Sequence, residues 1–277
     1  LESPPTFASV WEATVDRRAD SLFLIFEGSD GQVSEWTYGE FDGIVDRAAA
    51  TLVSNGVEAG SAVHMALANC PAFVAVWLAA IRLGAWVVTV DPVGGQVELR
   101  GHIERTRPAV GVCSSERADV YRSACGSLRV IVVEEQDPGL TAFRDGPIRS
   151  WPVPAPTDRA AVMFTSGTTG VPKGVEVTQA NYAFAGRTMA AAAGLDETDR
   201  QLVVLPLFHA NAQYYSFAAS IWAGASVALM SSFTASGFLG QAARHRATTA
   251  SLFAAPMRMI LARGGPVDEV LLRQCWF

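Results

Sequence analysis

The sequence predicts an α/β protein, and three observations support this class. Half of the 277 residues are hydrophobic and 17% are charged, so a large core can form. Apolar runs of strand length alternate with helical patterns over most of the chain. Turns rich in Gly and Pro separate these runs. The length allows one large domain or two ordinary ones.

The first half of the chain alternates between the two kinds of element. A helix is predicted over residues 7–15 and a strand over 22–26. Thr37 and Glu40 have the spacing of a capping box, which predicts a helix from there to Asn55-Gly56. The same reasoning predicts strands at 62–68, 86–90, 110–113 and 130–133, a helix at 73–83 that is buried on nearly every side, and a polar-faced helix at 98–106.

An internal boundary is predicted at Trp151–Pro156, where every second residue is proline and the chain is extended. It divides the chain into two α/β parts, residues 1–156 and 157–277. The second part is predicted to contain strands at 162–164, 175–178, 202–205, 226–230 and 249–253, and helices at 180–193, 237–245 and 257–263.

The segment Ala210–Phe233 has no charged residue and is long enough to cross a bilayer. Polar side chains and a turn at Ala223-Gly224 interrupt it. A buried helix followed by a buried strand therefore explains the segment better than a membrane span.

Charge and cysteine content narrow the classes of function. The net charge of −6 and the pI near 5.3 argue against a surface for nucleic acid or anionic lipid. The four cysteines have no metal-binding spacing, and the chain does not open with the pattern of a signal peptide. We expect the thiols to be buried and reduced, in a cytoplasmic protein.

One loop has the composition of a polyphosphate site. The apolar run 162–164 leads into a turn of small and hydroxylic residues, and Pro172-Lys173-Gly174 closes it before a second short strand. Glycines admit backbone N–H groups to phosphate oxygens, hydroxyls donate further hydrogen bonds, and lysine supplies a charge. The candidate phosphate-binding residues are Thr165, Ser166, Gly167, Thr168, Thr169, Gly170 and Lys173.

The loop does not match a Walker A motif. Pro172 occupies a position that requires glycine, and Gly174 follows Lys173 where Ser or Thr is needed. A strand is also predicted after the lysine in place of a helix. The alternative is an ordinary flexible surface loop, which the run of Ser, Thr and Gly disfavours.

The stretch Thr165–Gly174 resembles the phosphate-loop signature of the adenylate-forming superfamily, which contains acyl- and aryl-CoA ligases, peptide-synthetase adenylation domains and luciferases. The resemblance covers nearly the whole chain. It implies the multi-layer αβαβα sheets of the N-terminal domain of these enzymes, truncated before the C-terminal lid domain.

A second group of candidate residues follows the strand predicted at 202–205. His209 and Asn211 lie at the exit of that strand, and Tyr214 and Tyr215 follow them. Ligands of open α/β sheets bind beyond the carboxyl ends of strands, so this loop and the phosphate loop could flank one crevice. Taken alone, such a histidine is more often structural, and core packing explains the tyrosines equally well.

Pro206-Leu-Phe-His209 resembles the family's motif at the acid pocket, and this implies that His209 positions the carboxylate or gates the thiol tunnel. Domains that select α-amino acids have an Asp where this chain has Ala210. A buried ammonium without a carboxylate partner is costly. An acyl or aryl acid is therefore favoured over an α-amino acid.

By the same resemblance, ATP converts a small carboxylic acid to an acyl-adenylate, and coenzyme A or the phosphopantetheine of a carrier protein then displaces AMP. His209 and Lys173 are the predicted catalytic residues. Family segments that supply the Mg²⁺ ligand, the ribose-binding Asp and the lid lysine have no counterpart here, so no metal ligand is predicted. We therefore expect an N-terminal fragment of an acid–CoA ligase that is inactive alone.

Three alternatives remain open. A stand-alone adenylation enzyme that loads an acyl carrier protein would have the same visible motifs. A non-catalytic nucleotide-binding or interaction module would keep the fold without the reaction. A P-loop NTPase is the weakest of the three, because of Pro172 and Gly174.

Overall fold

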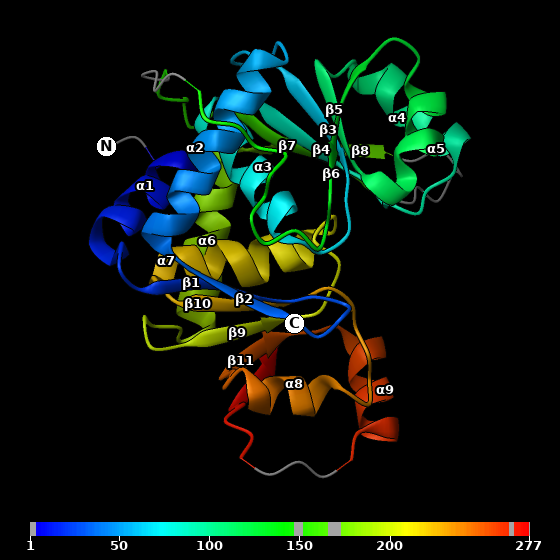
Figure 1. Cartoon of the computed structure of the whole chain (residues 1–277). Coiled ribbons are helices and arrows are strands. Elements are labelled where there is room, and N and C mark those ends of the chain that lie inside the picture. The colour runs from blue at the N-terminus through cyan, green and yellow to red at the C-terminus, as the bar shows by residue number, and fades with distance from the viewer. Residues whose placement is uncertain (1–3, 147–151, 166–172, 266–268, 277) are drawn as a thin grey trace. The chain divides into compact units, whose positions relative to one another are not determined.

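The computed structural model describes residues 4–146, 152–165, 173–265 and 269–276 (Figure 1). Its contacts divide the chain into two compact units that interleave along the sequence. Unit 1 comprises Leu1–Ser9 and Asp42–Tyr182, and unit 2 comprises Val10–Phe41 and Ala183–Phe277. The boundary predicted at residue 156 divides the chain into two consecutive parts, residues 1–156 and 157–277. That division stays a prediction.

Three helices contribute residues to both units: α1 (Phe7–Arg18), α2 (Tyr38–Ser54) and α6 (Gln179–Ala193). All three were predicted from the sequence, α1 with an earlier end. The sequence pattern therefore located these helices without revealing that the division between units passes through them.

The sheet of unit 1 has the strand order β6-β5-β3-β4-β7-β8. Its strands are β3 (Ala62–Ala66), β4 (Trp86–Thr89), β5 (Val110–Ser114), β6 (Arg129–Val133), β7 (Arg159–Thr165) and β8 (Lys173–Thr178). The first five run parallel, and β8 pairs with β7 in the antiparallel direction. Connections contain the helices α3 (Pro71–Arg82), α4 (Gln96–Thr106) and α5 (Ala118–Cys125) and the 3₁₀ turn η1 (Ser115–Arg117).

Helix α3 is the most deeply buried helix element described in unit 1, with all twelve of its residues in the interior. This confirms the helix predicted as apolar on nearly every side. Its last residue, Arg82, is also buried and forms ion pairs with Asp42 and Asp46 of α2. The two carboxylates satisfy a guanidinium that would otherwise be costly to bury.

The sheet of unit 2 has the strand order β12-β11-β9-β10-β1-β2 (Figure 1). Its strands are β1 (Leu22–Glu27), β2 (Val33–Thr37), β9 (Arg200–Val203), β10 (Ser226–Met230), β11 (Thr249–Ser251) and β12 (Gln274–Trp276). All run parallel except β2, which pairs antiparallel with β1. The connections contain the π-helix η2 (Asn211–Ala218) and the α-helices α7 (Ala219–Ala223), α8 (Phe238–Arg244) and α9 (Ala254–Arg263).

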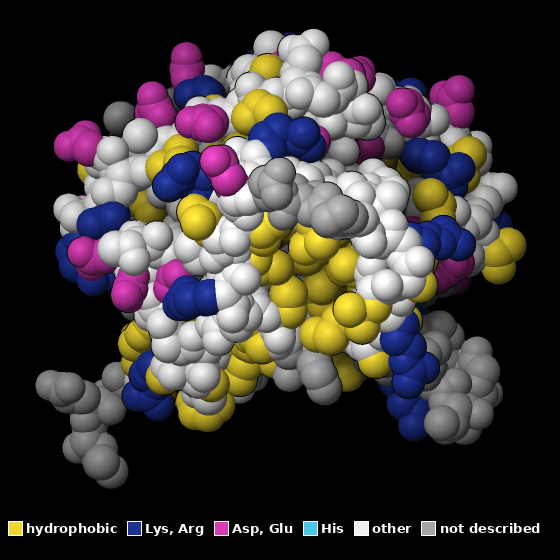
Figure 2. Space-filling view, turned by 90° about the horizontal axis from the view of Figure 1, so that it is seen from below, with side chains coloured by type: hydrophobic (Ala, Val, Ile, Leu, Met, Phe, Trp, Pro, Cys, Tyr) yellow, Lys and Arg dark blue, Asp and Glu magenta, His cyan; other side chains and the backbone are white. Residues whose placement is uncertain are grey.

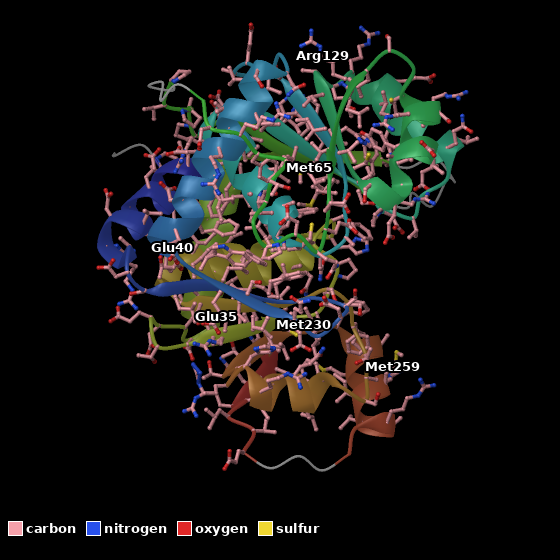
Figure 3. The ribbon with its side chains drawn as sticks, viewed as in Figure 1. Glu35, Glu40, Met65, Arg129, Met230 and Met259 are labelled. Atoms are coloured by element: carbon pink, nitrogen blue, oxygen red, sulfur yellow. The ribbon has the colours of Figure 1, made fainter. Side chains whose placement is uncertain are left out.

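The capping box predicted at the start of α2 is present. The backbone N–H of Glu40 donates to the Thr37 hydroxyl at 3.2 Å, and the N–H of Thr37 donates to the Glu40 carboxylate at 2.8 Å. Figure 3 labels Glu40 on this first turn. Both hydrogen bonds satisfy N–H groups at the junction of β2 and the helix.

The uncharged segment Ala210–Phe233 folds as η2, α7 and then β10. The prediction of a buried helix followed by a buried strand is confirmed, although most of the helix is of the π type. No helix in the described ranges is long and apolar enough to cross a membrane.

The cysteines follow the prediction at three of four positions. Cys70, Cys113 and Cys125 are buried free thiols. The expectation of burial is wrong for Cys275, which is exposed on the edge strand β12. Alternation along the strand turns Cys275 to the face opposite its neighbours Gln274 and Trp276.

Exposed apolar side chains occur in the C-terminal segment of unit 2. Figure 2 views the molecule from the end where α8 and α9 lie and shows hydrophobic side chains gathered on that face. Phe253, Met259, Leu261 and Leu271 all keep more than two fifths of their surface exposed, and Figure 3 labels Met259 on α9. The helix α9 buries Pro256 alone.

A buried histidine lies in the sheet of unit 1. The Nδ1 atom of His64 is 2.6 Å from the Tyr121 hydroxyl. A Cβ atom at Gly111 would lie 2.4 Å from that hydroxyl, so only glycine leaves room for it. Burial lowers the pKa of His64 from 6.5 to about 3, and nearby His102 acts in the same direction. His64 is therefore neutral in the folded protein.

Replacing Thr37 with Ala should lower the free energy of unfolding by about 1 kcal/mol, because the helix loses its N-cap hydroxyl. Thr37→Ser keeps the hydroxyl and is the matched control. Urea unfolding monitored by circular dichroism measures both. Equal midpoints for the Ala and Ser variants would show that the cap contributes nothing.

Acid should destabilise the protein through His64. The folded pKa is depressed, so the unfolded chain binds the proton more readily, and stability falls as the pH drops from 6.5 toward 3. The loss is on the order of 1 kcal/mol per pH unit. His64→Asn should reduce this slope in unfolding experiments between pH 6.5 and 4.5. Identical slopes in the two proteins would contradict the assignment.

Candidate functional site

The phosphate loop is framed by the antiparallel pair β7 and β8. Thr165, the last residue of β7, is the register partner of Lys173, the first residue of β8. The predicted loop residues Ser166, Gly167, Thr168, Thr169 and Gly170 lie outside the described residues. A strand follows Lys173, which confirms the argument against a Walker A motif.

Lys173 is the only lysine in the sequence, and its side chain is exposed. Since every other cationic side chain apart from histidine is an arginine, the lysine at this position stands out. An ammonium on a flexible stem acts as a mobile point charge, whereas a guanidinium is a planar fork.

The base of this hairpin is packed against α4. The Phe164 ring stacks on His102 with centroids 4.2 Å apart. On β8, a Cβ atom at Gly174 would approach the Val162 Cγ1 atom to 3.0 Å, so glycine permits close pairing there. These contacts hold the two strand ends that frame the loop.

The second group of predicted residues begins where β9 ends. Leu205 and Leu207 are buried, and His209 reaches the surface. The His209 N–H donates to the Pro206 carbonyl at 3.1 Å. The rings of Phe208 and His209 have centroids 4.3 Å apart. Buried leucines thus anchor a tight turn that presents the imidazole.

Asn211, Tyr214 and Tyr215 follow on the π-helix η2. π-Helices are rare and often occur at functional sites. The Gln213 side chain of this helix is buried and donates to the Leu207 carbonyl at 2.7 Å, which ties the helix to the histidine turn. Burial raises the pKa of Tyr214, so its hydroxyl is protonated.

Sequence reasoning missed the residues that support η2. The Gln201 side chain on β9 donates to the Tyr215 carbonyl at 3.3 Å. On α6, a Cβ atom at Gly186 would lie 2.6 Å from the Ala218 carbonyl oxygen, so α6 and η2 approach each other closely. Gln201 resembles any polar strand residue in the sequence, and Gly186 resembles any helical glycine.

The structure thus groups the predicted residues in two sets. Thr165 and Lys173 are strand partners in unit 1, and His209, Asn211, Tyr214 and Tyr215 share one turn and helix in unit 2. Within the described parts of the chain, no group of three or more His, Cys, Asp or Glu side chains could hold a metal ion. The roles of all these residues stay predictions.

Comparison with known proteins identifies the family. The family model described as AMP-binding enzyme matches residues 11–275. The chain therefore belongs to the AMP-binding enzyme family, as its phosphate-loop signature predicts.

Curated relatives include crotonobetaine/carnitine–CoA ligases. The chain is 27% identical to that of Citrobacter koseri over 274 residues, which cover 94% of this chain and 53% of the relative. The enzyme of Escherichia fergusonii is 28% identical with the same coverage. The chain thus spans about half the length of the curated relatives it matches.

Solved structures confirm the fold. A putative long-chain-fatty-acid CoA ligase from Rhodopseudomonas palustris superposes with a TM-score of 0.86 at 22% identity, over 98% of this chain and 69% of the other. ATP-bound MatB from the same organism gives 0.84 at 20% identity, over 97% and 54%. The anthranilate CoA ligase AuaEII with anthranoyl-AMP gives 0.83 at 19% identity, over 99% and 55%. The predicted α/β fold class is confirmed.

Gly186→Ala should destabilise the protein by about 1–3 kcal/mol, because the added methyl group collides with the Ala218 carbonyl of η2. Gly240→Ala is the matched control in the same unit, since a Cβ atom there meets nothing within 4 Å. That change should stabilise α8 by up to about 1 kcal/mol. Thermal unfolding of both variants measures the contrast, and equal shifts would refute the close approach.

Proposed function

We propose that the protein takes part in ATP-dependent activation of a carboxylic acid. A carboxylate oxygen attacks the α-phosphorus of ATP, the bond to the β-phosphate breaks, and pyrophosphate leaves. A thiol then displaces AMP to give a thioester. This proposal rests on two observations taken together. The chain belongs to the family, and the loop signature lies between the paired residues Thr165 and Lys173.

The phosphate loop is proposed to hold the β- and γ-phosphates. Backbone N–H groups and the hydroxyls of Ser166, Thr168 and Thr169 would donate hydrogen bonds, and Lys173 would supply the positive charge. Register pairing of Thr165 with Lys173 fixes both ends of this loop. Holding the leaving group and its charge lowers the barrier, because pyrophosphate departs with additional negative charge. Mg²⁺ would neutralise part of the phosphate charge when bound, and its ligand is expected in a family segment without a counterpart in this sequence.

The acid is proposed to bind beside His209 and Asn211, with Tyr214 and Tyr215 as walls of the pocket. The exposed imidazole of His209 would position the carboxylate. Ala210 has no carboxylate to pair with the ammonium group of an α-amino acid, and burying that group unpaired is costly. An acyl or aryl acid is therefore proposed as the substrate. The relatives named as CoA ligases favour coenzyme A as the thiol.

Loading of an acyl carrier protein is the second candidate. Product analysis of the full-length protein, with coenzyme A and with a phosphopantetheinyl carrier, separates the two acceptors. A non-catalytic module would bind nucleotide and form neither product. Cytoplasmic location is also proposed, on the basis of three free buried thiols.

ATP should protect Lys173 from acylation by an N-hydroxysuccinimide ester, because bound phosphates engage its amine. The sequence has no other lysine, so mass spectrometry of one tryptic peptide reports the reaction. AMP lacks the β- and γ-phosphates and should not protect. Lys173→Ala should weaken ATP binding about tenfold or more, since a charged hydrogen bond contributes roughly 1.5–3 kcal/mol.

Equal protection by ATP and AMP would place the lysine away from the β- and γ-phosphates. No protection by either nucleotide, together with unchanged ATP affinity of Lys173→Ala, would refute the proposed phosphate site. Lys173→Arg is the control that keeps a positive charge.

A further inference from the structure

A row of polar atoms lies buried in unit 2 without hydrogen-bond partners among the described residues. The row consists of Gln201 Oε1, Thr249 Oγ1, Ser251 Oγ and Trp276 Nε1 on the strands, and Asn211 Oδ1 on η2 is a further buried atom without a partner. Gln201, Thr249 and Ser251 are at least 97% buried. Most buried polar side-chain atoms in proteins have a partner, so five such atoms in neighbouring elements require an explanation.

Strand register places four of these side chains on one face of the sheet. Thr249 of β11 is paired with Gln201 of β9, and Ser251 of β11 is paired with Trp276 of β12. Paired residues of neighbouring strands point to the same side, and Thr249 and Ser251 share a side because they are two positions apart. The four polar groups therefore form a continuous row across β9, β11 and β12, which are adjacent in Figure 1.

The π-helix η2 covers this same face. The Gln201 amide donates to the Tyr215 carbonyl, and the Tyr215 ring meets the Trp276 ring edge-on with centroids 5.8 Å apart. Asn211, whose buried Oδ1 atom also lacks a partner, is the first residue of η2 and stands two positions after His209. The row thus lies beneath the helix that carries the proposed acid-binding residues.

Some neighbouring polar groups in this unit do have partners, while Ser220 Oγ on α7 and Gln241 Oε1 on α8 also lack one but lie outside the row. Thr248, next to Thr249, donates to the Asp199 carboxylate at 2.6 Å. Gln213 of η2 donates to the Leu207 carbonyl. A buried hydroxyl or amide left without a partner costs stability, and valine or leucine would fill the same space without that cost. The row is therefore better explained by recognition of a ligand than by packing.

We propose that this row recognises a hydrogen-bonding group on the substrate acid, remote from its carboxylate. The proposal rests on the proposed function. In the row, one amide oxygen accepts hydrogen bonds only, two hydroxyls accept and donate, and one indole N–H donates. This set suits a hydroxyl, amine or amide group of the acid. An acid with a plain hydrocarbon tail leaves the row unsatisfied and is rejected.

Pairs of acids of nearly equal size, one with and one without a hydroxyl group, test on the full chain whether the row recognises a polar group. Binding of 4-hydroxybenzoate and 4-methylbenzoate, and of 4-hydroxybutanoate and pentanoate, is measured by calorimetry in the presence of ATP. The hydroxylated member of at least one pair should bind about tenfold tighter or more, the least that one satisfied polar partner contributes in such a site. The double variant Thr249→Val, Ser251→Ala should lose this preference. Thr198→Val, an exposed position in unit 2, should keep it.

Stability supplies a second readout. If the Thr249 and Ser251 hydroxyls have no hydrogen-bond partner until a ligand binds, apolar replacements remove an unsatisfied buried group. The double variant should therefore have a higher midpoint of thermal unfolding without ligand. A lowered midpoint would show that the hydroxyls are satisfied structurally, by ordered water, and would overturn the proposal. Equal binding of both members of each pair would also overturn it while leaving acid activation intact. Failure of all four acids to bind, with ATP bound, would overturn this inference, whereas the ATP protection of Lys173 tests the proposed function separately.

Discussion

Parallel strand pairing is the constraint on which the arrangement of both units depends. Five of the six strands in each sheet run parallel, and such neighbours cannot be joined by a tight turn. Crossovers therefore return the chain each time, and the carboxyl ends of the strands gather at one edge of each sheet. The phosphate loop follows the end of β7, and the His209 turn follows the end of β9. Both sets of candidate residues occupy the edge where α/β sheets bind ligands.

Much of this fold can be predicted from the sequence, because its elements have strong local signals. The helix α3 is apolar on every side, and the start of α2 has the spacing of a capping box. The composition of the loop before Lys173 indicates a phosphate site from the sequence alone. In each case the signal is local, since a few neighbouring residues decide both the conformation and its chemical meaning.

Other features depend on contacts between distant segments, and local patterns do not encode them. The helix α5 and the strand β12 were not predicted, and the π type of η2 has no compositional signature. Gln201 and Thr249 look like ordinary polar residues until strand register places them side by side. Cys275 resembles the three buried cysteines until its strand is found at the edge of the sheet. The candidate site residues could therefore be predicted from the sequence. The contacts that support them could not, because these contacts join segments far apart in the chain.

The interleaving of the two units affects how the chain is made. β1 is synthesised early, yet its parallel neighbour is β10, where Leu24 pairs with Val227. At roughly 5–20 residues per second, a ribosome needs about 10–40 seconds to produce that partner. The continuous segment Asp42–Tyr182 emerges in the meantime and can complete its own sheet. During this interval the apolar strand Leu22–Glu27 has no β10 to pair with, so it is a natural client for a chaperone that binds nascent chains.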